Sequence, residues 1–165
     1  RNPGGFLPGE GAGACLLAND ASVSRYGLAT LARICAACTA MEPSPLRSGL
    51  PCTGQGLTAA VAAVTSDTAR QGKLISATYC DLNGERYRSE EFFYSLMRTG
   101  QAFANAHDYV APADCWGDVG AASGVLLMAL AVEAGNRNSA NGYTPLLWAS
   151  SDNRYRAAIT AALEC

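Results

Sequence analysis

The stretch DCWGDVGAASGVLLMALA, residues 114–131, carries the pattern that decides the fold of this chain. A glycine-rich turn with one acid, Asp118, leads into a helix predicted over 118–134. Between Gly120 and Gly135 the only polar side chains are Ser123 and Glu133. A helix that is apolar on all sides must be buried on all sides. Because one sheet covers only one face of a helix, the sequence predicts a second layer of protein, which this chain has little left to supply.

The sequence on both sides of this helix predicts a single α/β domain. Two strands come first, helices then alternate with strands, and a strand pair closes the chain, an order typical of a layered domain with a mixed sheet. The 165 residues suffice for one domain with its own core. The strands are predicted at 14–20, 29–42, 73–84, 108–114, 144–152 and 155–164, and the other helices at 56–72 and 89–106.

The composition narrows the class of protein. Apolar residues make up 49% of the chain and charged residues 16%, as in a globular domain. The net charge is −2 and the basic residues are scattered, so we expect no nucleic acid partner. No apolar run reaches the roughly 18 residues of a membrane-spanning helix, so we expect no membrane partner.

The seven cysteines are an odd number and most lie in apolar segments, which favours free, buried thiols in a reducing cytoplasm. Cys35 and Cys38 have the spacing of a redox motif. In a strand, however, positions three apart face opposite ways. No second cysteine pair or histidine cluster completes a metal site, and the sequence predicts neither a metal nor a cofactor.

Three motifs resemble those of β-ketoacyl synthases, which are members of the thiolase-like family. GFLPGEGAGACLL (5–17) is similar to their glycine-rich motif and strand, GDVGAASG (117–124) to their GHxxGAAG turn, and SSDNRYRAAITAAL (150–163) to their closing strand pair. The resemblance follows nearly the whole chain in order. It implies that residues 1–165 are the C-terminal half of a thiolase-like fold: a mixed five-stranded sheet with helices on both faces, normally stacked on a second similar half. The N-terminal half is then absent from this chain, which we expect to be a piece of a longer protein.

The resemblance also implies where the family's chemistry would lie. The family uses a Cys nucleophile, in the other half, and two histidines that stabilise a developing oxyanion. In the segment CDLNGERYRSEE (80–91), Cys80 or Asp81 is nearest the first histidine position. Asp118 takes the second, and Ala113 lies near the position of a family lysine. An ionised Asp accepts hydrogen bonds but donates none, and two carboxylates beside an oxyanion raise the barrier unless burial keeps one protonated. We therefore assign no catalytic residue in this chain, and treat Cys80, Asp81, Ala113 and Asp118 as candidate pocket positions.

Each of these positions also has a structural interpretation. Asp118 suits a helix cap, Asp81 suits a turn with Asn83 and Gly84, and Cys80 has no histidine nearby in sequence to activate it. The run Arg86–Glu91 predicts a solvated helix start; its alternative is a rim that receives the acidic surface of a carrier protein or a phosphopantetheine phosphate. His107 is predicted to be a surface or capping residue.

The resemblance implies a synthase-like protein with its catalytic histidines replaced. It would bind acyl thioesters or acyl carrier protein, or partner a true synthase, without decarboxylative condensation, and this chain alone would be inactive. Its expected partners are the N-terminal half of the same fold or a homologous synthase subunit, and acyl carrier protein. Two alternatives stay open: an acyltransferase that uses a Cys in the missing half, and a structural module whose pocket is filled by large side chains around Asp81 and Asp118.

Overall fold

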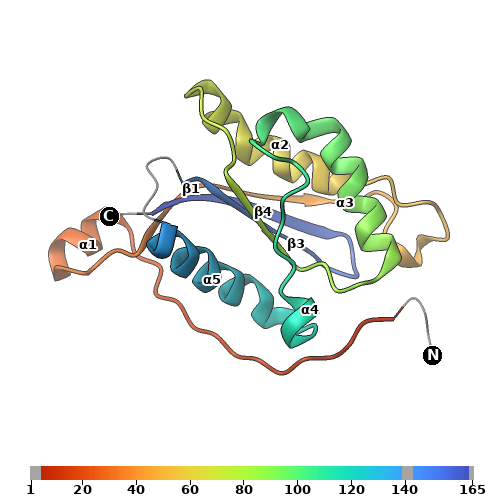
Figure 1. Cartoon of the computed structure of the whole chain (residues 1–165), viewed down its shortest axis with the longest axis horizontal. Coiled ribbons are helices and arrows are strands. Elements are labelled where there is room, and N and C mark those ends of the chain that lie inside the picture. The colour runs from red at the N-terminus through yellow and green to blue at the C-terminus, as the bar shows by residue number, and fades with distance from the viewer. Residues whose placement is uncertain (1–4, 139–142, 164–165) are drawn as a thin grey trace.

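The computed structural model describes residues 5–138 and 143–163 and shows a mixed sheet with helices on both faces (Figure 1). The strand order is β1-β4-β3-β2, with β1 antiparallel to β4, β4 antiparallel to β3, and β3 parallel to β2. The predicted α/β class and mixed sheet are therefore confirmed. The four strands of the described residues are β1 (Ala32–Met41), β2 (Ala77–Cys80), β3 (Pro145–Ser150) and β4 (Tyr155–Leu163).

The strand predicted at 108–114 is reduced to a single bridge between Val110 and Tyr79 of β2. Val110 exchanges two backbone hydrogen bonds with β2. Pro112, two residues later, has no N–H to continue such a ladder and instead caps the short helix α4 (Ala113–Trp116). The sheet of the described residues thus has four strands rather than five, and Val110 adds only an isolated bridge at the edge of β2.

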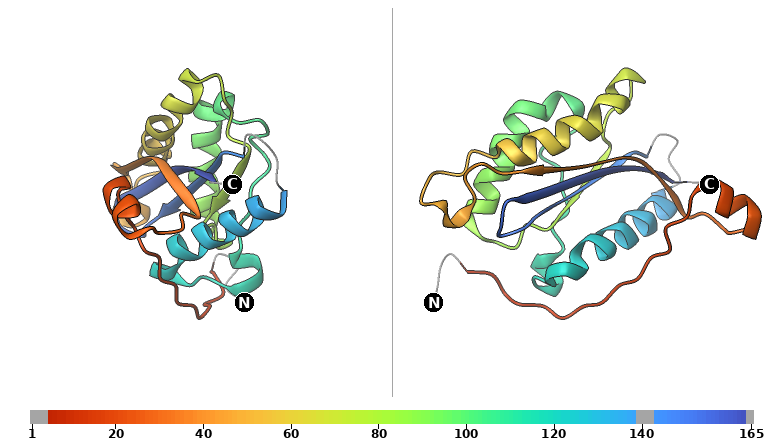
Figure 2. Two further views of the ribbon diagram at one scale, coloured as in Figure 1. Left: turned by 90° about the vertical axis from the view of Figure 1, so that its left-hand side faces the viewer. Right: turned by 180° about the vertical axis from the view of Figure 1, so that it is seen from behind.

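Helices α2 (Gln55–Arg70) and α3 (Arg86–Thr99) cover one face of the sheet, and α5 (Ser123–Asn138) lies on the other (Figure 2). The buried residues of α5 are Leu127, Ala131 and Gly135, four apart, which form one stripe toward the sheet. On the opposite face of the sheet, helix α2 packs Leu57, Val61 and Val64 into the larger core cluster, which contains Trp148. The remaining elements are α1 (Asp20–Tyr26) and the 3-10 helices η1 (Leu46–Ser48), η2 (Gly100–Ala102) and η3 (Gly120–Ala122).

The predicted strand at 14–20 is wrong. Residues 9–19 are irregular and follow the outer side of α5 (Figures 1 and 2), and α1 starts at Asp20 behind the cap residue Asn19. A strand needs a neighbour for its backbone N–H and C=O groups, and the described chain pairs none with this segment. Its apolar side chains remain in solvent: Leu16 is 79% exposed and Leu17 is 73% exposed.

Two further predictions differ from the structure. Helix α3 begins at Arg86, three residues before the predicted start at residue 89, and its N-cap residue is Glu85. The six described cysteines are free, as predicted, but the prediction that they are buried is confirmed only for Cys80, and Cys15, Cys35 and Cys115 are exposed. Within the described chain, alternate side chains of the edge strand β1 and the segment 10–19 before α1 are exposed. No described helix combines the length and the apolar content that crossing a bilayer requires.

Candidate functional site

Four segments meet beyond the carboxyl ends of the parallel strands β2 and β3. They are the loop 81–85 after β2, the first turns of α3, the turn 150–153 after β3, and the turn around Asp118 before α5. The carboxyl ends of parallel strands lie at one edge of a sheet, where ligand sites of α/β proteins commonly form. The sequence segments 80–91 and 117–124, singled out above, are therefore brought together.

Arg88 is the centre of this cluster. Its side chain is only 8% exposed and pairs with Asp81 (Nη1–Oδ2, 3.4 Å), Glu85 (Nε–Oε2, 3.0 Å) and Asp152 (Nη2–Oδ1, 2.7 Å). Its Nη1 also donates to the carbonyl oxygen of Ser150. Burial by itself would lower the pKa of Arg88, but the carboxylate of Asp81 and its other partners raise it above its usual value. The guanidinium is thus a fixed positive charge, and all three of its nitrogens are engaged.

The prediction of a solvated start for this helix is wrong at two positions. Arg88 and Glu91 are buried, one turn apart on the inner side of α3. Charged side chains are tolerated there because each has a counter-charge: Arg88 pairs with Asp81, and Glu91 with Arg156. Arg86 and Glu90 do lie on the exposed side and pair with each other.

Asp81 has one satisfied oxygen and one free oxygen. Oδ2 accepts the backbone N–H of Ser150 (2.9 Å) and pairs with Arg88, whereas Oδ1 is buried and has no hydrogen-bond partner. Burial raises the pKa of Asp81 to about 6, which Arg88 and the Ser150 N–H oppose and the charge of Asp118 reinforces. This carboxyl therefore titrates close to neutral pH, and its free oxygen can accept a hydrogen bond.

Asp118 contacts both the turn it belongs to and the loop after β2. Oδ1 accepts the backbone N–H of Gly120 (2.8 Å), and Oδ2 accepts Nδ2 of Asn83 (2.7 Å). The same amide nitrogen of Asn83 also donates to Glu85 Oε2 (2.9 Å). The capping interpretation of Asp118 is wrong, because α5 begins five residues later at Ser123 and the N-cap of η3 is Val119. Oδ1 instead closes a turn onto Gly120, while Oδ2 joins this turn to the segment that resembles the first histidine position. Gly117 makes this turn possible, because with φ 78° a Cβ there would lie 2.7 Å from the backbone N of Gly9.

A small pocket adjoins the cluster and includes three of the four predicted positions. Cys80, Asp81 and Ala113 line it, whereas Asp118 is turned toward Asn83. Its lining carries no positively charged side chain, so it offers no side-chain cation for a phosphate. The lining residues are Cys80, Asp81, Pro112, Ala113, Trp116, Gly117, Ser123 and Leu127.

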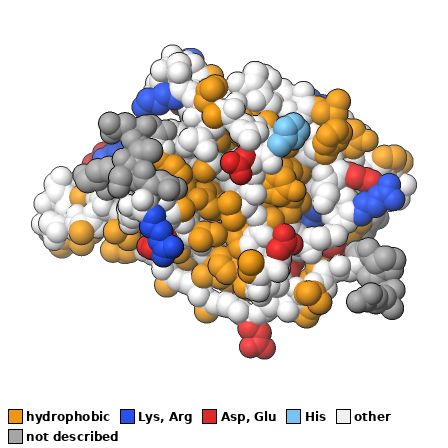
Figure 3. Space-filling model, viewed as in Figure 1, with side chains coloured by type: hydrophobic (Ala, Val, Ile, Leu, Met, Phe, Trp, Pro, Cys, Tyr) orange, Lys and Arg blue, Asp and Glu red, His pale blue; other side chains and the backbone are white. Residues whose placement is uncertain are grey.

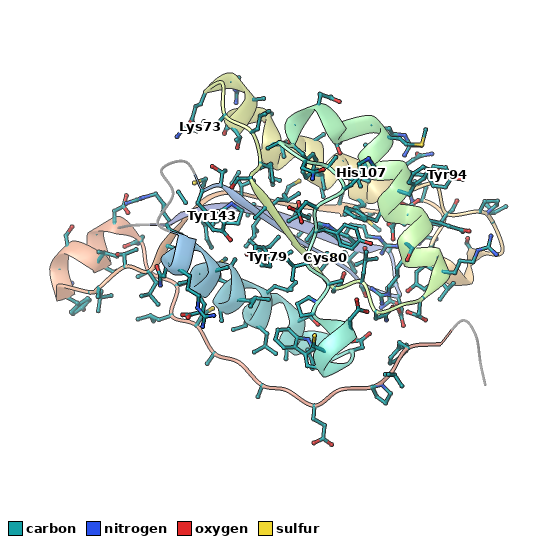
Figure 4. The ribbon with its side chains drawn as sticks, in the orientation of Figure 1. Lys73, Tyr79, Cys80, Tyr94, His107 and Tyr143 are labelled. Atoms are coloured by element: carbon teal, nitrogen blue, oxygen red, sulfur yellow. The ribbon has the colours of Figure 1, made fainter. Side chains whose placement is uncertain are left out.

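Cys80 is placed as a structural thiol. It is fully buried at the end of β2 (Figure 4), and its Sγ contacts the carbonyl oxygen of Val110 at 3.5 Å. Burial raises the pKa of the Cys80 thiol to about 12. The thiolate, which is the nucleophile, is then scarcely populated at neutral pH. His107 is exposed and lies apart from Cys80 (Figure 4), so it does not activate this thiol.

Sequence reasoning missed the side chains that hold this site together. The sequence predicts a turn at Asn83 and a solvated helix start at Arg88, and it assigns no role in a site to Glu85 or Asp152. The available signal was the density of polar residues in DLNGERYR (81–88), directly after a buried strand. A segment of this kind at the carboxyl end of a strand is where site residues collect.

Comparisons with known proteins agree on the fold. A ketosynthase/chain length factor for ishigamide matches with 17% identity and a TM-score of 0.56, over 82% of this chain and 36% of its own. A type II ketosynthase, solved with its acyl-carrier protein and bound to a hexaketide, matches with 9% identity and a TM-score of 0.59, over 88% and 37%. Human mitochondrial 3-ketoacyl-CoA thiolase matches with 14% identity and a TM-score of 0.60, over 89% and 34%.

The chain therefore has the ketosynthase and thiolase fold that its motifs predict, and it spans about a third of the length of these proteins. No protein-family model matches the sequence, and no curated protein matches it.

Proposed function

We propose that this chain is the C-terminal half of a synthase-like protein that binds acyl thioesters without decarboxylating them. One observation carries the proposal: the segments that resemble the two histidine motifs present carboxylates, and the donors beside them are already engaged. Asn83 donates to Asp118 and Glu85, and Arg88 is surrounded by acceptors. Stabilising a developing oxyanion requires donors aimed at it, which such a cluster does not supply.

We also propose that this chain associates with the N-terminal half of the same fold or with a homologous synthase subunit. Leu16 and Leu17 stand in solvent in a segment whose sequence favours a strand. Apolar side chains also gather over and around α5 on the face shown in Figure 3. A second half that pairs with residues 14–18 and covers this face would bury both the two leucines and the apolar side chains around α5. One matching structure is described as a ketosynthase/chain length factor, which is consistent with pairing between related subunits.

We propose an acyl carrier protein as a further partner. We also propose a cytoplasmic location, because free thiols are typical of a reducing compartment. One matching ketosynthase is described in complex with its acyl-carrier protein. The predicted basic rim supports this docking only weakly, since Arg88 is buried and Arg86 is paired with Glu90. Docking would then depend on surfaces that the second half contributes.

The second candidate function is acyl transfer that uses a Cys of the other half. The free oxygen of Asp81 favours it, since a carboxyl that titrates near pH 6 is suited to act as a general base. Such an enzyme would form an acyl adduct without releasing carbon dioxide.

The test is incubation of the full-length protein with acyl and malonyl thioesters, beside an active synthase as a control. Intact mass detects an adduct, headspace analysis detects carbon dioxide, and equilibrium dialysis detects binding. We expect saturable binding of the acyl thioester without carbon dioxide release. A stable acyl adduct would move the assignment to the second candidate. Decarboxylation at the rate of the control would overturn the proposal, and the absence of both binding and adduct would leave a structural module.

A further inference from the structure

A second cluster of ionisable side chains lies away from the pocket, between the sheet and helices α2 and α3. Glu42 follows the last residue of β1, Cys52 lies in the loop before α2, and Glu91 projects from the inner side of α3. One ligand atom from each of these three residues lies within 4.8 Å of the others. Glu42 and Glu91 are both about 1% exposed or less, so the two carboxylates are inside the core.

One oxygen of this cluster lacks a partner. Glu42 Oε2 accepts the backbone N–H of Gly56 (2.7 Å), but Oε1 is buried without any hydrogen-bond partner. A buried carboxylate oxygen without a hydrogen-bond partner carries the desolvation penalty of that oxygen with nothing to offset it. The sheet and helix around it thus hold an acceptor in place that nothing else in the described chain uses.

The charges of the cluster do not balance either. Arg156 is buried and bonds Glu91 Oε1, and its Nη1 is turned to the carbonyl oxygens of Ser151, Asn153 and Tyr155. Among the described hydrogen bonds and ion pairs, no cationic group reaches Glu42. Of the two buried carboxyl groups, only Glu91 has a guanidinium partner, so a negative charge on Glu42 has no counter-charge in the core, where uncompensated charge is costly.

The loop is shaped to close on these residues. A Cβ at position 54 would lie 2.5 Å from the carbonyl oxygen of Glu91, and one at position 56 would lie 2.7 Å from the backbone N of Glu42. Glycine at both positions lets the backbone around Cys52 approach the two acids closely. The thiol is thereby held beside the carboxylates although it is 39 and 10 residues away from them in sequence.

We propose that Glu42, Cys52 and Glu91 bind one divalent transition-metal ion, with Zn²⁺ as the preferred metal. A thiolate with two carboxylates is a ligand set that Zn²⁺ accepts, whereas Mg²⁺ and Ca²⁺ take oxygen ligands. On binding, the Cys52 S–H bond is replaced by an S–Zn bond and the proton leaves to solvent. Two carboxylates, one thiolate, Arg156 and Zn²⁺ then sum to zero charge. No sequence motif indicates this site, because its ligands come from three separate segments.

The experiment measures zinc and cobalt binding by the full chain after removal of metal with a chelator. Isothermal titration gives the zinc stoichiometry and affinity, and Co²⁺ reports a thiolate ligand through its charge-transfer absorption. The starting protein carries Cys15→Ser, Cys35→Ser and Cys115→Ser, which remove the three exposed thiols of the described residues, since these could bind metal adventitiously. Cys52→Ser and Glu42→Gln are then added to it separately.

We expect one zinc per chain, a cobalt charge-transfer band, and a rise in the unfolding temperature with zinc but not with magnesium. Cys52→Ser should abolish the band, and each added variant should weaken zinc binding at least about tenfold. Retention of the cobalt band in Cys52→Ser, or no zinc binding by the starting protein, would overturn the proposal. If Glu42→Gln does not fold, the cobalt spectrum of Cys52→Ser decides alone.

Discussion

The substitution Arg88→Met gives the sharpest test of how the site is held together. It removes the guanidinium that pairs with Asp81, Glu85 and Asp152 while keeping an unbranched side chain of comparable length. Asp81 is 13% exposed and Glu85 is 15% exposed, so both acids would be left mostly buried without a counter-charge. Removing one partner of a buried ion pair typically costs about 3–5 kcal/mol. Because Asp152 is largely exposed, its pair adds little to this sum.

The loss of unfolding free energy in Arg88→Met should also depend on pH, because protonation of Asp81 removes its uncompensated negative charge. Burial already raises the pKa of Asp81 from 3.8 to about 6 in the folded chain. The folded state therefore binds the proton more tightly than the unfolded state, and stability falls as the pH rises from about 4 to about 6. Two pKa units correspond to about 3 kcal/mol. Without Arg88 the pKa of Asp81 rises further, so the destabilisation should be smaller at pH 5 than at pH 8.

Urea unfolding, followed by the fluorescence of buried Trp148, measures the free energy of unfolding at both pH values. Arg86→Met is the matched control: Arg86 is exposed, and its pair with Glu90 is worth no more than about 0.5 kcal/mol. A loss below about 1 kcal/mol for Arg88→Met, or an equal loss at pH 5 and pH 8, would show that Arg88 is not the counter-charge of a buried site.

Three other outcomes are expected. Asp118→Ala removes two hydrogen bonds and should lower the free energy of unfolding by about 1–2 kcal/mol, whereas a change below about 0.3 kcal/mol in urea unfolding would contradict its role in joining this turn to the loop after β2. Iodoacetamide at pH 8 should modify Cys35 at least tenfold faster than Cys80, because Cys35 is exposed and burial raises the pKa of the Cys80 thiol to about 12. Peptide mass spectrometry measures both rates, and equal rates would argue for a reactive Cys80. The pair Leu16→Ser and Leu17→Ser should leave the stability of this chain within about 0.5 kcal/mol but weaken its association with the proposed N-terminal half in size-exclusion chromatography, and unaltered association would refute that interface.

The sequence determined much of the architecture because local patterns carry it. The apolar run after Asp118 predicted a helix, which is present as α5, but its burial on all sides is not seen: within the described chain only Leu127, Ala131 and Gly135 are buried, along one stripe toward the sheet. The closing strand pair formed as β3 and β4, and the motif order indicated the ketosynthase and thiolase fold. These features depend on periodicity and on glycine-rich turns, which are readable within a short window.

The tertiary structure alone decided which residues meet and which lose their partners. The segment 14–20 has the sequence of a strand, but it is not one in this chain because no described strand pairs with it. The sequence predicts that Arg88 is a surface residue, yet it is buried. Its charge is paired with Asp81, and it donates a hydrogen bond to the carbonyl oxygen of Ser150, 62 residues away. Whether a charged side chain is buried depends on counter-charges brought together by folding, and the spacing along one helix does not contain that information.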